Sequence, residues 1–158
     1  MKLDGNYVAG FVDGEGCFYI RHYEKKKYSC PEFAIKVRLD DWQIICAIKE
    51  SLGCGKIFRK QEKNRHNQAI GLLICRKEDI IKKVIPFFET YPLLAKKKVD
   101  FDLWKEAALM WSNGEFKTEK GKKRLLEIRS QLNVFREDIA RQIPEEYIHY
   151  NWSSSKYH

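Results

Sequence analysis

The sequence predicts an α+β domain with a four-stranded antiparallel sheet. Three observations predict this class: a short helix of small and apolar residues at 7–16, two pairs of strand-like segments after it, and an amphipathic helical pattern after each pair. The chain shows no internal repeat at a fixed period and no low-complexity linker. We therefore expect one domain over residues 1–143 and a C-terminal tail over residues 144–158.

The first strand pair follows the N-terminal helix directly. Residues 17–27 are rich in aromatic side chains, a turn is expected at 29–31, and residues 33–39 alternate between apolar and basic or small side chains. Asp40 and Asp41 then provide an N-cap for a helix. Its apolar stripe is expected to be Trp42, Ile45, Ile48 and Leu52, and Gly53 and Gly55 end it.

The second strand pair is expected at 56–61 and 68–75, joined by the basic segment 62–67. A helix then opens at Glu78 and Asp79 and breaks or kinks at Pro86. A longer helix is predicted from about residue 93 to residue 111. The last helix covers residues 118–132, with a continuation at 134–142.

The composition favours an anionic partner. The 158 residues include 30 Lys and Arg against 22 Asp and Glu, a formal net charge of +8, which suits nucleic acid without separating DNA from RNA or from an anionic membrane. No apolar run reaches the ~18 residues of a membrane span, so we expect a soluble, intracellular protein. The five cysteines form no C-x-x-C pair, which argues against a disulfide framework or a structural zinc site.

Two carboxylates, Asp13 and Glu15, stand at the C-terminal end of the first helix. This position runs against helix electrostatics, because the C-terminal end of a helix carries partial negative charge. A divalent cation held by oxygen ligands would compensate. The small residues Ala9, Gly10 and Gly14 would also let a second helix approach closely enough for two such ends to share a site.

Residues 8–16, Val-Ala-Gly-Phe-Val-Asp-Gly-Glu-Gly, resemble the signature motif of the LAGLIDADG homing endonucleases. The resemblance implies the αββαββα fold of that family, with a saddle-shaped sheet over double-stranded DNA, and metal-dependent, site-specific cleavage that leaves 3′ overhangs. Such enzymes are encoded inside introns or inteins. Because one motif is present, the resemblance implies a homodimer and a pseudo-palindromic target. The expected interface residues are Val8, Ala9, Gly10, Phe11, Val12 and Asp13.

The resemblance also implies catalytic residues. Glu15 is expected to bind Mg²⁺ together with Gly14, and Mn²⁺ should be able to substitute. A lysine near the scissile phosphate is expected just after Pro92, with Lys96 as first choice and Lys98 as second; a solvated helix start explains each lysine equally well. Leu39 occupies the place where the family commonly has a water-positioning polar residue, which is a departure.

DNA reading is expected on the hairpins, because alternate side chains of a strand share a face and a two-stranded ribbon fits the major groove. Taken singly, each candidate is more safely interpreted as part of a strand's polar face, and the expectation rests on both hairpins being basic opposite their apolar residues. The candidates are Arg21, Tyr23, Lys25, Lys36, Arg38, Arg59, Lys60, Arg65 and Gln68.

Two alternatives to the nuclease remain on this scaffold: a maturase that binds intron RNA, and a DNA-binding protein without catalysis. A generic basic RNA-binding module is a third reading, but it leaves the helix-end carboxylates unexplained. The sequence does not choose between an organelle and an archaeal cytoplasm as location.

Overall fold

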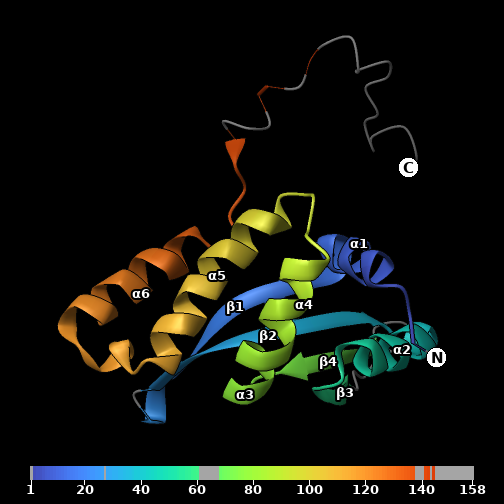
Figure 1. The fold of residues 1–158 in the computed structure, drawn as a ribbon, viewed down its shortest axis with the longest axis horizontal. Helices are drawn as coiled ribbons and strands as arrows, with labels where there is room; N and C mark the ends of the chain where they lie inside the picture. Colours follow the sequence, from blue (N-terminus) through green and yellow to red (C-terminus); the bar gives the residue numbers. More distant parts are fainter. Residues whose placement is uncertain (1, 27, 61–67, 138–140, 143, 145–158) are drawn as a thin grey trace, which may run out of the picture.

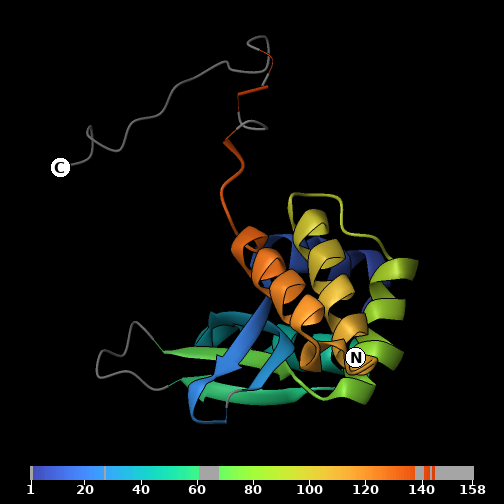
Figure 2. The same cartoon turned by 90° about the vertical axis from the view of Figure 1, so that its left-hand side faces the viewer.

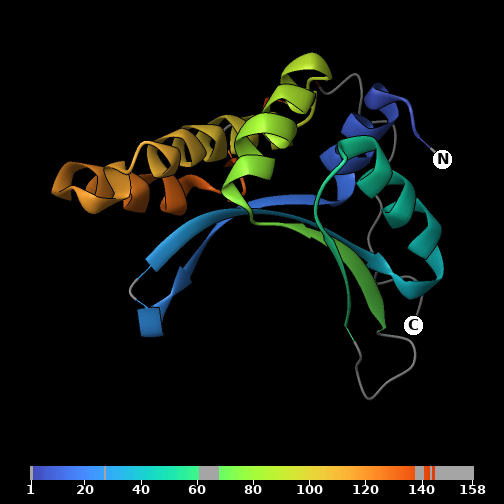
Figure 3. The ribbon, with the colours of Figure 1, turned by 60° about the horizontal axis from the view of Figure 1, so that its bottom comes forward.

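The computed structural model describes residues 2–26, 28–60, 68–137, 141–142 and 144. Its centre is a four-stranded antiparallel sheet with the strand order β1-β2-β4-β3. The sheet is curved, and the helices lie on its convex side while its concave side is open (Figures 1 and 3). The predicted α+β class and the order of helices and strands are confirmed.

The motif helix α1 (Gly5–Glu15) runs directly into the sheet. Asp4 caps its N-terminus by accepting hydrogen bonds from the backbone N–H groups of Asn6 and Tyr7 at 2.9 and 3.2 Å. Strand β1 (Gly16–Tyr23) begins at the next residue, without a loop. Position 16 has no room for a side chain, because a Cβ there would lie 2.7 Å from the carbonyl oxygen of Val12. Glu15 is therefore held at the junction of helix and sheet.

The first hairpin turns earlier than the sequence predicted. The 3₁₀ turn η1 (Glu24–Lys26) follows β1, and β2 (Tyr28–Arg38) contains residues 29–31, so the expected turn there is wrong. Pro31 suggested that turn. A proline is tolerated in a strand where one edge is unpaired, and β4 pairs with β2 only from Phe33 onward.

The first helix after the hairpin forms largely as predicted. The 3₁₀ turn η2 (Leu39–Asp41) leads into α2 (Trp42–Leu52), which ends at Gly53 in the left-handed conformation with φ = 66°. Ile45, Ile48 and Leu52 are buried, but Trp42 is 49% exposed and does not belong to the stripe. Trp42 opens the helix, one turn before its first buried residue.

The second hairpin consists of β3 (Lys56–Lys60) and β4 (Ala69–Ile74). Three helical segments follow: α3 (Lys77–Asp79), the π-helix η4 (Ile80–Val84) and α4 (Ile85–Thr90), with Pro86 in the first turn of α4. The expected break therefore takes the form of a change of helix type. α5 (Lys97–Ser112), the 3₁₀ turn η5 (Glu115–Lys117) and α6 (Glu119–Gln131) complete the convex layer (Figure 2).

A cluster of aromatic rings joins the sheet to the helices. Phe18 of β1 stacks on Phe33 of β2 with 4.7 Å between ring centroids. Phe88 of α4, and Phe101 and Trp104 of α5, lie 5.1–5.8 Å from the Phe18 ring centroid. Such tilted and edge contacts stabilise the fold beyond simple burial. The cluster fixes the first hairpin against the two helices behind it.

Candidate active site and nucleic-acid interface

The two carboxylates of the motif have different environments. Asp13 accepts hydrogen bonds through Oδ2 from the backbone N–H groups of Leu94 and Ala95, at 2.8 and 3.2 Å. These bonds tie the end of α1 to the segment before α5, and α5 begins at Lys97 rather than near residue 93 as expected. Glu15 is exposed at the helix end, and the last turn of α1 carries no basic residue. Asp13 thus links two elements of the candidate site, and the Glu15 carboxylate is exposed beside that link.

The three consecutive lysines after Pro92 also differ. Lys96 is exposed, and Lys98 forms an ion pair with Asp102. Lys97 is half-buried, and its positive charge acts on Cys17, two residues beyond Glu15. Burial raises the pKa of the Cys17 thiol, and the charge of Lys97 lowers it in part. Lys97 was not among the candidates from sequence, whose choice depended on where α5 begins.

One face of α1 is largely open within the described part of the chain, with only Phe11 packed partly against the core. It consists of Tyr7, which is 52% exposed, the partly buried Phe11, and Gly10 and Gly14, at which an added Cβ would meet no atom within 4 Å. These positions follow helical spacing. Val8, Ala9 and Val12, which were expected in the interface, are instead buried in the core of the same chain. They lie on the opposite side of the helix and are unavailable to a second protein.

A buried carboxylate organises the concave face at the first hairpin. Glu32 is 1% exposed and accepts hydrogen bonds from the Tyr19 hydroxyl at 2.7 Å, the Arg21 Nε at 2.8 Å and the Tyr23 hydroxyl at 3.0 Å. Burial and the Glu32 hydrogen bond raise the pKa of Tyr19 to about 12. Arg21 and Tyr23, both candidate DNA contacts, are therefore held in fixed positions. The sequence prediction did not find Glu32.

The remaining candidates divide between the two faces of the sheet. Lys36 lies opposite Gly71, and both Arg38 and Lys60 lie opposite Ala69, so these cations share the concave face.

Arg59 lies opposite Ile70 and donates a hydrogen bond to Gln68 at 2.7 Å, which places this pair on the other face. Lys25 is exposed in the turn η1. Arg65 lies outside the described residues.

An aromatic ring that the sequence analysis left out also faces the concave side. A Cβ added to Gly71 would lie 2.5 Å from the Phe58 ring and 2.5 Å from the carbonyl oxygen of Ile35. The ring of Phe58 therefore covers Gly71, next to Lys36. On the concave face, the Phe58 ring of the edge strand β3 therefore lies beside Lys36 of the inner strand β2, so apolar and cationic side chains are neighbours there.

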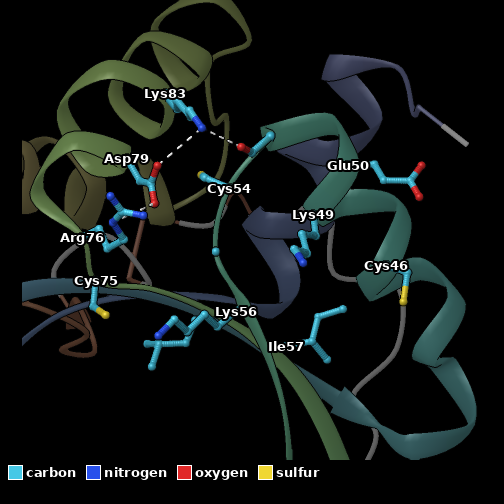
Figure 4. A pocket seen from close by; sticks show the side chains of 13 residues that line it. Cys46, Lys49, Glu50, Cys54, Lys56, Ile57, Cys75, Arg76, Asp79 and Lys83 are labelled. Carbon is cyan, nitrogen blue, oxygen red and sulfur yellow. Dashed lines mark hydrogen bonds and ion pairs between the residues drawn. The ribbon is translucent and has the colours of Figure 1, made fainter.

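A hollow of about 640 Å³ lies between the end of α2 and the start of α3 (Figure 4). Lys83 bridges its two sides, donating to the Gly53 carbonyl at 2.7 Å and pairing with Asp79 at 3.4 Å. Cys46, Cys54 and Cys75 line the hollow. The described residues contain no cluster of three or more His, Cys, Asp or Glu side chains arranged to hold a metal ion. We interpret this hollow as a structural junction.

A curved antiparallel sheet with cations on its open face, helices behind it and an acidic helix end at its border defines a nucleic-acid-binding α+β protein. The profile of the LAGLIDADG endonuclease family matches residues 8–108. The chain therefore belongs to the LAGLIDADG endonuclease family. Across the described part of the chain, no helix combines the length and apolar character needed to cross a membrane.

Relatives of known sequence are much longer than this chain. It is 34% identical over 128 residues to the "Probable intron-encoded endonuclease 2" of Neurospora crassa, an alignment that covers 81% of this chain and 27% of that protein. The chain thus spans between 26% and 37% of the length of these curated relatives.

Solved structures share the fold. The homing endonuclease I-TnaI matches with a TM-score of 0.75 and 32% identity over 92% of this chain and 99% of that one. I-GzeII in complex with its DNA target matches with a TM-score of 0.76 and 29% identity, over 86% of this chain and 46% of that one. I-SmaMI on uncleaved DNA with calcium ions matches with a TM-score of 0.74 and 25% identity, over 89% and 49%.

We predict that Asp13→Ala loosens the junction between α1 and α5. The backbone N–H groups of Leu94 and Ala95 lose their acceptor, so their amide hydrogen exchange, measured by NMR, should accelerate and the free energy of unfolding should fall by about 1–2 kcal/mol. Glu15→Ala is the matched control, because the Glu15 side chain is exposed. Unchanged protection of both amides in Asp13→Ala would contradict this role of Asp13.

Proposed function

We propose that the chain is one subunit of a homodimeric, metal-dependent endonuclease that cuts both strands of a long, pseudo-palindromic DNA site and leaves 3′ overhangs. The observation that carries this proposal is the exposed carboxylate of Glu15, which ends α1 next to the open face of that helix. A protein that only binds DNA gains nothing from a carboxylate placed toward phosphates. Retention of Glu15 therefore favours the nuclease over a binding protein without catalysis.

The residues at the end of α1 fit a divalent cation. Glu15 supplies a hard oxygen ligand, the Gly14 carbonyl is a second, and the helix end adds partial negative charge with no basic residue in the last turn to offset it. Magnesium bound there would lower the pKa of an attacking water and stabilise the charge that develops on the phosphate. I-SmaMI, with its calcium ions and DNA target, supports a divalent ion in this role.

Lys97 is our choice for the cation beside the scissile phosphate. Its half-buried side chain lies on the first turn of α5. The positive charge of Lys97 acts on Cys17, which follows Glu15 by two residues in the chain. Lys98 is occupied by Asp102, and Lys96 is fully exposed. A cation fixed near the phosphate stabilises its negative charge in the transition state.

The open face of α1 supports the homodimer. Gly10 and Gly14 allow two helix backbones to approach closely, and Tyr7 and Phe11 border the contact. A twofold axis through this contact would bring two copies of Glu15 together and give one active site for each DNA strand. The relatives' names describe intron-encoded proteins, and we infer the same origin for this chain, with its target in the organelle or cell that carries the intron.

We predict that Glu15→Gln abolishes Mg²⁺-dependent cleavage of the target while DNA binding stays within about threefold, because the amide keeps the shape of the side chain but binds the cation weakly. A cleavage-site selection from a randomised DNA library identifies the target first. Glu119→Gln, on the exposed start of α6, is the control. Cleavage by Glu15→Gln at the rate of the parent chain would remove the catalytic assignment.

We predict that Lys97→Met slows cleavage by about 10²-fold or more with little change in target affinity, since the lost charge acts mainly in the transition state. Lys96→Met should stay within about threefold of the parent rate. Single-turnover kinetics measures both. If Lys96→Met slows cleavage more than Lys97→Met does, Lys96 is the lysine beside the scissile phosphate, as the sequence first suggested.

We predict that Gly10→Leu converts the dimer to monomer in analytical ultracentrifugation without unfolding the chain. A side chain at position 10 meets nothing in the single chain, so its only clash would be with a partner helix. Gly53→Ala is the comparison. It should lower the stability of the fold, because φ is 66° at this position, but it should leave the dimer intact. A Gly10→Leu protein that still sediments as a dimer would place the interface elsewhere.

A further inference from the structure

A second hollow, of about 990 Å³, is lined by residues from the end of the β1–β2 hairpin and from the turn that joins α5 to α6. Figure 3 shows these two segments at the same end of the molecule. We call this space the hairpin hollow and define it by the aromatic residues Tyr28 and Trp111, the cations Lys77, Lys117 and Arg129, and the apolar Leu126. Its volume suits a ligand the size of a nucleotide.

The aromatic part of the hairpin hollow is built from two rings. Lys77 Nζ lies 5.1 Å from the centroid of the Trp111 ring, and Trp111 and Tyr28 both line the hollow. Tyr28 is 41% exposed, although it stacks on Tyr23 with 6.3 Å between ring centroids. Exposed or half-buried rings of this kind offer a face on which an unpaired base can stack.

The charged side chains that line the hairpin hollow are all positive. Lys77, Lys117 and Arg129 contribute cations, and no Asp or Glu is among the described residues that line the hollow. Leu126, which is 62% exposed, adds an apolar surface between them. Cations next to rings match the two parts of a nucleotide, a phosphate and a base.

The backbone of β2 adds hydrogen-bonding capacity beside the hollow. β4 pairs with β2 only from Phe33 onward, so no described strand pairs with residues 28–32 on that edge. Unpaired backbone N–H and C=O groups on a strand edge can bond the edge of a base. A base that is already paired in a duplex cannot reach them.

We propose that the hairpin hollow binds an unpaired nucleotide of a single-stranded nucleic acid, with the base on Tyr28 and Trp111 and the neighbouring phosphates on Lys77, Lys117 and Arg129. RNA and single-stranded DNA share this chemistry. A DNA duplex keeps its bases stacked inside and would touch only the cations. The site uses none of the residues at the end of α1, and it meets the concave face where Tyr28 stacks on Tyr23.

The test measures binding of the full chain to fluorescent oligonucleotides of about ten nucleotides: oligouridylate, oligothymidylate and a dA·dT duplex. Both single strands should bind more tightly than the duplex. The double variant Lys117→Glu, Arg129→Glu should weaken single-strand binding by about tenfold or more. Lys120→Glu, Lys123→Glu is the matched control, since it makes the same charge change on the exposed start of α6 and should cost less than about threefold.

Three results would overturn the proposal. Equal losses in the two double variants would indicate a general effect of charge. If the duplex binds as tightly as the single strands, and the Lys117→Glu, Arg129→Glu variant weakens both equally, the cations contact flanking duplex DNA instead. Uridine monophosphate binding as tightly as the strand would assign the hollow to a free nucleotide. If oligouridylate binds more tightly than oligothymidylate, the ligand is RNA. If the two bind equally, the hollow accepts both RNA and single-stranded DNA.

Photocrosslinking of a 5-iodouridine strand locates the base directly and does not depend on a variant that folds. Crosslinks should appear on Tyr28 or Trp111. Crosslinks confined to the concave face, at Lys36 or Arg38, would contradict the hairpin hollow as the site.

Discussion

The hydrogen bonds that Asp13 accepts from the Leu94 and Ala95 N–H groups fix the geometry on which the rest of the active site depends. They join the C-terminal end of the first helix to the segment that starts α5, although the two are separated by the whole sheet in sequence. Lys97 and Glu15 are thereby placed at the same end of the molecule. A carboxylate at a helix C-terminus is electrostatically unfavourable, and this link is a structural reason for keeping one there.

The two faces of the sheet have separate chemistry. On the concave face, cations lie beside the Phe58 ring, and one buried carboxylate positions Arg21 and Tyr23. On the convex face, the aromatic cluster around Phe18 attaches the helices, and the hairpin hollow opens where that layer ends. The candidate DNA contacts and the proposed single-strand site therefore draw on different elements, apart from the hairpin end where Tyr28 stacks on Tyr23.

The fold class, the order of the elements and the motif helix could be predicted from sequence, because hydrophobic periodicity and the motif are local signals. The first turn could not. Pro31 indicated a turn, and only the pairing partner of β2 shows that its edge is free there. That error also hid Glu32, which faces Tyr19 only in the observed register. Two further features also depend on tertiary contacts. One is the burial of Val8, Ala9 and Val12 in the core of the same chain, and the other is the position at which α5 starts.

The burial of Glu32 has a consequence for changing the recognition of such a protein. Position 21 is a candidate DNA contact, but the Arg21 guanidinium is also the counterion of a carboxylate that is 1% exposed. Removing the cation alone leaves a buried charge with two tyrosine donors and no compensating charge. Retargeting at position 21 is thus a two-residue problem, in which Arg21 and Glu32 have to be exchanged together.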